Sequence, residues 1–570
     1  MFKLLRYMKG YKKECFLGPL FKLLEATFEL LIPLVVARIV DVGIAGKDIG
    51  YIVKMCLVMA LLGVVGLISA VTAQYFAAKA AVGFSARLRH VVMERILCLS
   101  YTQIDTLGTS TMITRMTSDI NQIQNGVNLT LRLLLRSPFV VFGAMVMAFT
   151  IDVQAALVFA GVIPLLCVIV FGIMLITMPM YRRVQRRLDG VTAATRQNLA
   201  GVRVLRAFCK EESEIGDFSR QTEALADGQL AAGRISGLMN PLTYVMINLA
   251  VVLLIQVGAI KVESGVLTQG LVVALYNYMS QILVELIKMA NLIISITKAV
   301  ACGNRIEAVL EIPVKTETSA KEEIGAEVAF HDVTAQYASA AEPSLENISF
   351  RALPGQTIGI IGGTGSGKTT LINLIPRFYD ATKGEVTLNG VNVKEIGQEA
   401  LRSQIGIVPQ RAVLFKGTIR ENLRWGKQDA SDEELYAALE LAQAREIVDS
   451  KEGGLDAPVE QGGTNFSGGQ RQRLTVARAL VRNPKILILD DSASALDYAT
   501  DAKLRMAIRG MQNPPTTFIV SQRAASVRYA DQIIVLEDGK ISGSGTHDWL
   551  LENCNVYQEI YYSQFPKEVD

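Results

Sequence analysis

A glycine-rich stretch between two apolar runs constrains this chain more than any other feature. The spacing G-x-x-x-x-G-K-[ST] is matched by Gly362, Gly363, Thr364, Gly365, Ser366, Gly367, Lys368, Thr369 and Thr370. The apolar run 357–361 before it predicts a buried strand, and the run 371–375 after it predicts a helix. In that context the glycines turn backbone N–H groups toward a polyphosphate, and the helix N-terminus adds partial positive charge. We therefore expect a nucleotide site in which Lys368 reaches the outer phosphates and Thr369 holds Mg²⁺, rather than a turn with a chance Lys-Thr pair.

The composition of the chain points to a membrane protein. Half of the 570 residues are hydrophobic and 19% are charged, against roughly 25% charged in ordinary soluble chains. The apolar excess lies in the first 310 residues. A net charge of +3 argues against nucleic acid as a partner, and seven scattered cysteines predict neither a disulfide framework nor a metal site.

Six apolar stretches predict transmembrane helices, since each can cross a hydrocarbon core of roughly 30 Å. They are 16–40, 52–78, 127–150, 154–180, 237–260 and 267–299. The connections after the second and the fourth stretch are long and rich in arginine, so they and both termini are predicted to be cytoplasmic. Residues 1–9 are basic and amphipathic, which is typical of a helix at the membrane interface.

The long connections keep a helical period, so the helices are expected to continue beyond the membrane. The second one is predicted to run unbroken from Tyr51 to Ser100, roughly 75 Å at 1.5 Å per residue. Breaks near Gly108 and at Gly201 predict where each long helix pair turns round. These turns are well placed to touch a cytoplasmic domain.

Charged residues lie within or beside the predicted spans. They are Glu25, Glu29, Arg132, Arg136, Glu285 and Lys288. Because ionisable groups are unfavourable in lipid, these side chains are expected to face a cavity or one another. Two interpretations of these charges remain, a substrate path and internal ion pairing. Glu285 and Lys288, three apart on one helix, can neutralise each other.

The sequence changes character after residue 310. We expect a transmembrane domain over 1–310, a polar linker over 311–325 and a nucleotide-binding domain over 326–570. Within the last, residues 327–334 and 517–520 read as strands, and Asn389-Gly390 and Asp538-Gly539 read as hairpin turns. The apolar run 486–489 ends in Asp490, where folds with a phosphate loop carry the carboxylate that coordinates Mg²⁺.

A second set of motifs resembles the ATP-binding-cassette (ABC) proteins. The ABC signature is matched by Phe466, Ser467, Gly468, Gly469 and Gln470, followed by a basic helix and the strand ending in Asp490. Gln410 matches the Q-loop, which also contacts the metal, Asp497 in the run 494–497 matches the D-loop, and Tyr337 matches the aromatic residue that stacks on adenine. The resemblance covers essentially the whole chain. It implies an α-helical membrane domain of six long transmembrane helices followed by an α/β P-loop ATP-binding cassette with a helical subdomain.

Two positions depart from the family pattern. Asp491 stands where the family has the Glu that polarises the attacking water, and Gln522 stands where it has His. Asp is one methylene shorter, and an offset of about 1 Å can lower a rate by on the order of 100-fold. Gln can form hydrogen bonds but carries no positive charge. The chain therefore resembles the degenerate-site subunit of heterodimeric bacterial multidrug exporters, whose partner half-transporter has intact Glu and His.

The resemblance implies ATP-driven export of small amphipathic molecules, with ATP and Mg²⁺ as cofactors, from a multi-pass position in the bacterial plasma membrane. Hydrolysis is expected chiefly at the partner's P-loop, facing the signature motif of this chain. The alternatives are a defined peptide, lipid or thiol cargo, siderophore uptake, and a nucleotide-gated regulator that binds ATP without pumping. Spans of Leu, Val, Ile and Ala specify little chemistry, so the cargo stays open.

Overall fold

The computed structural model describes residues 2–314, 325–337, 340–492 and 495–565. The chain divides into two compact units, one formed by Met1–Leu97 with Ser110–Ile312 and the other by Cys98–Thr109 with Pro313–Asp570. Most of the expected linker, residues 315–324, lies outside the described residues, as does Ser494 of the expected D-loop.

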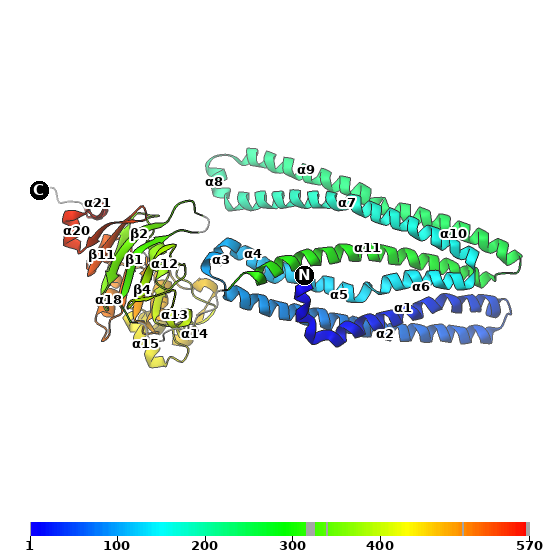
Figure 1. The fold of residues 1–570 in the computed structure, drawn as a ribbon, viewed down its shortest axis with the longest axis horizontal. Coiled ribbons are helices and arrows are strands. Elements are labelled where there is room, and N and C mark those ends of the chain that lie inside the picture. Colours follow the sequence, from blue (N-terminus) through cyan, green and yellow to red (C-terminus); the bar gives the residue numbers. More distant parts are fainter. Residues whose placement is uncertain (1, 315–324, 338–339, 493–494, 566–570) are drawn as a thin grey trace. The chain divides into compact units, whose positions relative to one another are not determined.

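The first unit consists of long helices joined by short turns (Figure 1). Its elements are η1 (Phe2–Tyr11), α1 (Lys12–Arg38), η2 (Ile39–Ile44), α2 (Ile49–Leu97), α4 (Thr109–Thr114), η3 (Arg115–Asp119), α5 (Ile120–Leu133), α6 (Arg136–Ile151), α7 (Val153–Ala200), α8 (Val202–Ala207), α9 (Glu211–Gly237), α10 (Met239–Glu263) and α11 (Gln269–Glu311). Helix α2 has 49 residues and α7 has 48. The prediction of helices that far exceed the membrane thickness is confirmed, and so are the breaks at Gly108 and Gly201.

Among the residues that the structure describes, five segments are long and apolar enough to cross a membrane, not the six predicted. They are Ile49–Leu97, Thr109–Ile151, Val153–Ala200, Glu211–Glu263 and Gln269–Glu311. The expected first span, 16–40, corresponds to α1 and falls short of this standard. Its apolar run is interrupted by Lys22, Glu25 and Glu29, which lie within seven residues of one another.

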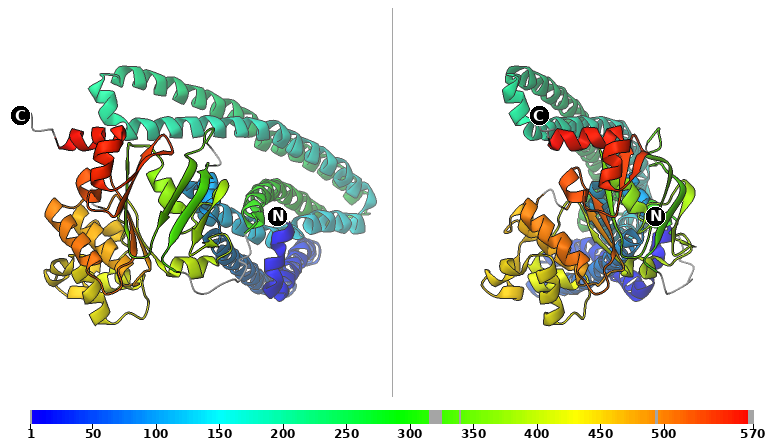
Figure 2. Two further views of the ribbon diagram at one scale, coloured as in Figure 1. Left: turned by 60° about the vertical axis from the view of Figure 1, so that its left-hand side comes forward. Right: turned by 90° about the vertical axis from the view of Figure 1, so that its left-hand side faces the viewer.

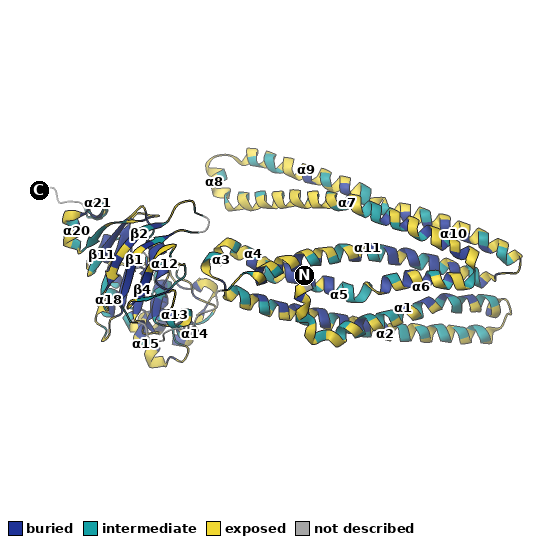
Figure 3. Ribbon diagram, in the orientation of Figure 1, coloured by how far each residue is buried: buried dark blue, intermediate teal, exposed yellow. Residues whose placement is uncertain are grey.

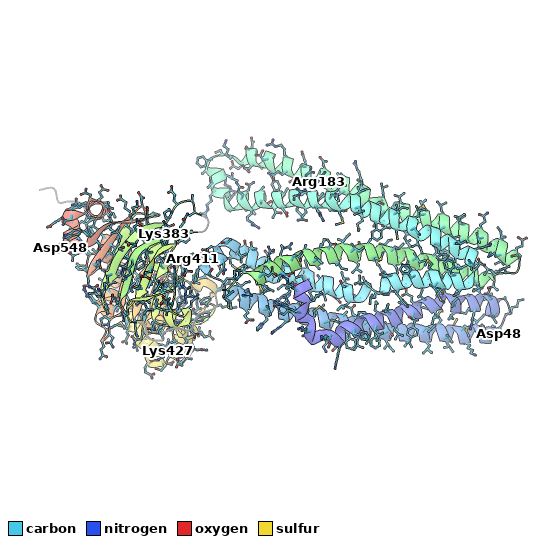
Figure 4. All side chains as sticks on the ribbon, in the orientation of Figure 1. Asp48, Arg183, Lys383, Arg411, Lys427 and Asp548 are labelled. Atoms are coloured by element: carbon cyan, nitrogen blue, oxygen red, sulfur yellow. The ribbon has the colours of Figure 1, made fainter. Side chains whose placement is uncertain are left out.

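Polar contacts join the turns at one end of the helical unit. The carboxylate of Asp41 accepts hydrogen bonds from Thr268 Oγ1 at 2.5 Å and from the N–H of Gly270 at 2.7 Å. Asp152, between α6 and α7, forms an ion pair with Lys261 near the end of α10. Figure 4 shows Asp48 at this end and Arg183 on the extension of α7 toward α8. The apolar helices are thus joined to one another at their polar ends.

The far ends of α7 and α9 form a hairpin that lies apart from α1, α2 and α5 (Figures 1 and 2). This hairpin is largely exposed (Figure 3). Large apolar side chains around its tip are exposed to solvent: Leu199, Val202, Val204, Phe208 and Ile215. Exposed apolar side chains gathered at one place commonly mark a surface that another chain covers.

The second unit contains two main sheets. A four-stranded antiparallel sheet has the order β2-β1-β4-β5, and a six-stranded sheet has the order β12-β11-β3-β10-β9-β6, parallel except for β12. A short pair, β7 with β8, completes the set. The strands are β1 (Val328–Ala335), β2 (Leu345–Ala352), β3 (Thr357–Gly362), β4 (Lys383–Leu388), β5 (Val391–Asn392), β6 (Ile405–Val408), β7 (Gly417–Thr418), β8 (Pro458–Val459), β9 (Ile486–Asp490), β10 (Thr516–Val520), β11 (Gln532–Glu537) and β12 (Lys540–Gly545).

Helices complete this unit and bury the parallel strands on both faces (Figure 3). They are α3 (Tyr101–Leu107), α12 (Lys368–Leu374), α13 (Gln398–Ser403), α14 (Ile419–Arg424), α15 (Asp432–Leu441), α16 (Arg445–Asp449), η4 (Gly454–Asp456), η5 (Gln461–Gly463), α17 (Gly468–Leu480), α18 (Tyr498–Arg509), α19 (Ala524–Val527), α20 (His547–Asn553) and α21 (Asn555–Gln564). The predicted strands and both hairpins are confirmed. Asn389 and Gly390 both have positive φ (47° and 76°), as a two-residue hairpin turn requires.

The short helix α3 belongs to the second unit although it follows α2 directly in the chain. The Tyr101 ring stacks on Phe378 with centroids 4.4 Å apart. The Tyr379 hydroxyl donates a hydrogen bond of 2.6 Å to the carboxylate of Asp105. The segment before Gly108 is therefore part of the second unit, and two aromatic side chains after the phosphate-loop helix hold it there.

Asp119 connects two helices of the first unit, which leads to a stability prediction. Its buried carboxylate accepts hydrogen bonds from Arg115 at 2.8 Å and from Arg305 of α11 at 3.0 Å. We expect Asp119→Ala to destabilise the purified protein by about 2–4 kcal/mol, because two arginines lose a buried partner. Asp217→Ala, which removes an exposed pair with Arg220, is the matched control and should change stability by less than about 1 kcal/mol. Equal melting temperatures for the two variants would contradict a structural role for Asp119.

Candidate nucleotide site

The glycine-rich loop follows the carboxyl end of β3 and leads into α12. Gly365 and Gly367 have φ of +87° and +94°, a region that side chains rarely adopt. A Cβ at Gly367 would lie 2.6 Å from the carbonyl oxygen of Ser344 and 2.7 Å from Leu345 Cδ2. The loop therefore depends on glycine at this position, and it presents backbone N–H groups at the start of a helix, as a phosphate cradle does.

Most of the predicted site residues surround one cavity of about 380 Å³. Its lining includes Tyr337, Thr364, Gly365, Gly367, Lys368, Thr369, Thr370, Gln410, Asp490, Asp491 and Gln522, and also Ser344, Val520 and Ser521. Gly362, Gly363 and Ser366 belong to the same loop but lie outside this lining. The carboxyl ends of β3, β9 and β10 meet here because these strands are parallel neighbours, and ligands of open α/β sheets bind at such an edge.

Lys368 and Asp490 lie in the cavity without a direct ion pair between them. The Lys368 ammonium donates hydrogen bonds to the carbonyls of Gly362 at 2.9 Å and Gly363 at 2.5 Å, and burial lowers its pKa. Burial raises the pKa of the Asp490 carboxyl, and the nearby charge of Asp491 adds to this effect. An anion with a bound cation would relieve both effects, since it supplies a negative partner for Lys368 and a positive one for Asp490.

Hard oxygen ligands for Mg²⁺ are present at the same place. The Thr369 hydroxyl lies 3.2 Å and 3.3 Å from the two oxygens of Asp490, and the side chain of Gln410 lines the same cavity. Among the described residues there is no cluster of three or more His, Cys, Asp or Glu side chains suited to a metal. These residues fit a metal that takes its remaining oxygens from phosphate and water, as Mg²⁺ does.

The two residues that depart from the family pattern lie on adjacent strand ends. Asp491 follows β9 with φ of +45°, and its N–H donates to the carbonyl of Val520 at 2.9 Å. Gln522 follows β10. The backbone carbonyl of Gln522 accepts a hydrogen bond from Gln564 Nε2 at 2.8 Å. Gln564 Oε1 in turn accepts one from the backbone N–H of Ala524 at 2.9 Å. Sequence reasoning missed Gln564, because nothing in the sequence links a glutamine of the last helix with a loop 42 residues earlier.

The expected signature residues lie outside the lining of this cavity. Ser467 caps α17 and forms a capping box with Gln470, with contacts of 3.0 Å and 3.3 Å. The N–H groups of Gly468 and Gly469 begin the helix, so they have no acceptor within it. Phe466 is buried. Asp497 caps α18 and accepts from the N–H of Thr500 at 2.8 Å.

Tyr337 lies at the rim of the cavity, where an adenine ring is expected. Its hydroxyl is 3.0 Å from Thr370 Oγ1, and its ring meets Tyr379 edge to face with centroids 5.0 Å apart. Tyr379 is the residue that bonds Asp105 of α3. The rim of the cavity is therefore in contact with α3 through a single tyrosine.

Comparisons with known proteins agree with this geometry. Residues 15–286 match the family model of the ABC transporter transmembrane region, and residues 345–494 match the family model described as ABC transporter. An uncharacterized ABC transporter ATP-binding protein of Mycobacterium tuberculosis is 37% identical over 98% of this chain and 97% of its own length. The chain belongs to the ABC transporter family.

This ABC transporter chain is a half-transporter, in which a transmembrane region is fused to one ATPase domain. An ATP-dependent lipid A-core flippase of Desulfotalea psychrophila is 32% identical to it over 80% of each chain. The structure of a bacterial Atm1-family ABC exporter with ATP bound matches its fold with a TM-score of 0.77 and 22% identity, over 98% of this chain and 99% of the other.

The geometry of the phosphate loop predicts a selective loss of nucleotide binding. We expect Gly367→Ala to weaken binding of a fluorescent ATP analogue at least tenfold, because its Cβ requires both a strained φ and a shift of Ser344. Gly363→Ala is the matched control, since a Cβ there meets nothing within 4 Å. Tight binding by the Gly367 variant would show that the loop adopts another conformation when nucleotide binds.

Proposed function

We propose that this half-transporter exports small amphipathic molecules as the degenerate-site subunit of a heterodimer, driven chiefly by ATP hydrolysis at its partner's P-loop. The observation that carries this proposal is the presence of Asp491 and Gln522 in the lining of the phosphate-loop cavity. Asp491 is shorter than the Glu that the family has there, and Gln522 lacks the positive charge that His can carry.

The position of the signature residues supports a two-chain site. Gly468 and Gly469 lie outside the cavity of this chain, with helix-starting N–H groups free to meet an anion from another subunit. The exposed apolar tip formed by α8 and its flanks supports a partner as well. A homodimer would combine two sites with a short carboxylate, whereas a heterodimer supplies one intact site.

Each residue of the cavity has a proposed role in this scheme. Tyr337 stacks on adenine, the P-loop residues with Lys368 bind the phosphates, and Thr369, Asp490 and Gln410 hold Mg²⁺. Bound Mg²⁺ neutralises charge on the outer phosphates. Asp491 and Gln522 hold the terminal phosphate poorly for hydrolysis, so this site keeps its nucleotide while the partner site turns over. The short helix α3 transmits closure of the cassettes to α2.

The chain is proposed to lie in the bacterial plasma membrane with both termini in the cytoplasm. The five apolar segments are proposed to cross the bilayer, with α1 as the sixth, since Lys22, Glu25 and Glu29 within its apolar run are paired inside the protein. A lipid cargo is the second candidate, favoured by the similarity to a lipid A-core flippase. Transport of a dye panel and of labelled lipid in vesicles separates the two.

The heterodimer proposal predicts a large effect of the partner on ATP hydrolysis. The chain purified alone should hydrolyse ATP slowly, because both of its composite sites would carry Asp491. Co-expression with a half-transporter that has the intact Glu and His should raise turnover at least tenfold. Brisk hydrolysis by the single chain would refute the degenerate-site assignment.

The same proposal predicts which motif of this chain matters most. We expect Gly468→Asp to lower the ATPase rate of the complex roughly 100- to 1,000-fold, since a side chain there displaces donors that stabilise the transition state. Asp491→Asn should retain much of the activity, and Lys368→Ala should give an intermediate loss through weaker ATP binding. A Cβ at Gly468 meets nothing within 4 Å in this chain, so the loss would not arise from misfolding. Equal damage from Asp491→Asn would place the main site on this chain.

A further inference from the structure

The loop that carries Gln522 is held by a side chain of α21, the last helix of the cassette. Gln564 donates a hydrogen bond from Nε2 to the backbone carbonyl of Gln522 at 2.8 Å. Its Oε1 accepts one from the backbone N–H of Ala524 at 2.9 Å. A single planar amide thus fixes the backbone on both sides of Arg523, and two bonds from one rigid group restrain the orientation of the loop as well as its position.

Helix α21 is itself a fixed support. Tyr557, about two turns before Gln564, is fully buried, and its hydroxyl lies 2.8 Å from Nδ1 of His547. Tyr561 and Phe565 pack against an apolar core of the cassette. The side chain of Gln564 is exposed. Packing therefore sets the position of the helix, while the exposed amide of Gln564 adds little to the stability of the fold.

The bonds of Gln564 bear on a side chain of the nucleotide cavity. Strand β10 ends at Val520, and the N–H of Ser521 donates to the carbonyl of Ile360 in β3 at 3.1 Å. Gln522 comes next, and its side chain lines the phosphate-loop cavity. Because its carbonyl and its side chain are attached to the same Cα, a bond that holds the carbonyl also restrains the direction of the side chain. A displacement of about 1 Å is enough to lose a productive contact.

A second support of the loop comes from the segment before α18. The Arg523 guanidinium donates to the carbonyl of Leu496 at 3.3 Å and lies 5.3 Å from the ring centre of Tyr498. This support holds the middle of the loop. The bonds of Gln564 are shorter, and one of them is made to Gln522 itself.

We propose that Gln564 is a positioning residue of the nucleotide site, which directs the side chain of Gln522 toward the terminal phosphate of ATP. This inference rests on the proposed function, in which Gln522 contacts that phosphate, and it adds a control of that contact by α21. ADP lacks the terminal phosphate. Gln564 should therefore affect the preference for ATP over ADP, and not nucleotide binding in general.

The test measures displacement of a fluorescent nucleotide from the purified chain in lipid nanodiscs with Mg²⁺, by a non-hydrolysable ATP analogue and by ADP. Gln564→Met keeps the length of the side chain but forms neither hydrogen bond. It should lower the preference for the ATP analogue at least about threefold, leave the affinity for ADP within about twofold, and change the melting temperature by less than about 3 °C. Gln564→Glu should act in the same direction, because a carboxylate cannot donate to the Gln522 carbonyl.

Gln558→Met is the matched control. Gln558 belongs to the same helix, and its Nε2 donates to the carbonyl of Leu551 at 2.7 Å, away from the loop, so the preference should persist. Gln522→Ala should lower the preference by itself, and adding Gln564→Met to it should cause no further loss.

An unchanged preference in Gln564→Met or in Gln522→Ala, or a further loss in the double variant, would overturn the proposal. The degenerate-site function is judged separately, by ATP hydrolysis of the chain with and without its partner. A chain that shows the expected loss in Gln564→Met but hydrolyses ATP briskly alone would retain the positioning role and refute the degenerate site.

Discussion

In lipid, a chain must satisfy its backbone hydrogen bonds within itself, and this constraint governs the first 312 residues of the protein. Helices are the solution that this chain uses, and α2 and α7 extend the same hydrogen-bonded ladder well past the apolar core. A continuous ladder is stiff, so displacement at one end of such a helix is carried to the other. At one end of the helical unit, Asp41 bonds the start of α11 and Asp152 pairs with Lys261 of α10. At its other end α2 leads into α3.

Most of the cassette could be predicted from sequence because its signals are local. The phosphate loop, the strand ending in Asp490 and the Asn389-Gly390 turn each depend on a few consecutive residues, and the structure places them as expected. The membrane domain was predicted less completely. Apolar run length alone suggested a span at 16–40, but three charges interrupt it. Lys22 pairs with Glu25 within the same run, whereas Glu29 pairs with Arg136 of α6. The pair of Glu285 with Lys288 was visible at a spacing of three, whereas Arg136 and Glu285 are 149 residues apart and only the fold joins them.

The candidate nucleotide site likewise combines features that local sequence predicts with contacts that only the fold reveals. Residue identity at the strand ends predicts that Asp491 and Gln522 are weak substitutes, which stays a prediction; the structure places both in the lining of one cavity with Lys368. Residue identity did not indicate that Gln564 of the last helix bonds the loop on both sides of Arg523, or that Tyr379 joins Tyr337 to α3. These contacts depend on tertiary packing, which one sequence taken alone does not reveal. The start of α17 is a further example, since the open space around Gly468 appears only in the folded structure.

The inclusion of residues 98–109 in the cassette unit has a consequence for biosynthesis. This segment leaves the ribosome more than 200 residues before Phe378 and Tyr379, which it packs against, and a helix of seven residues is too short to be stable alone. The segment with Tyr101 and Asp105 therefore stays unfolded, at the end of α2, until its partners in the cassette have been synthesised. The cassette therefore finishes folding only when its later residues have been synthesised and reach residues 98–109. The order of synthesis thus sets the order in which the two units form.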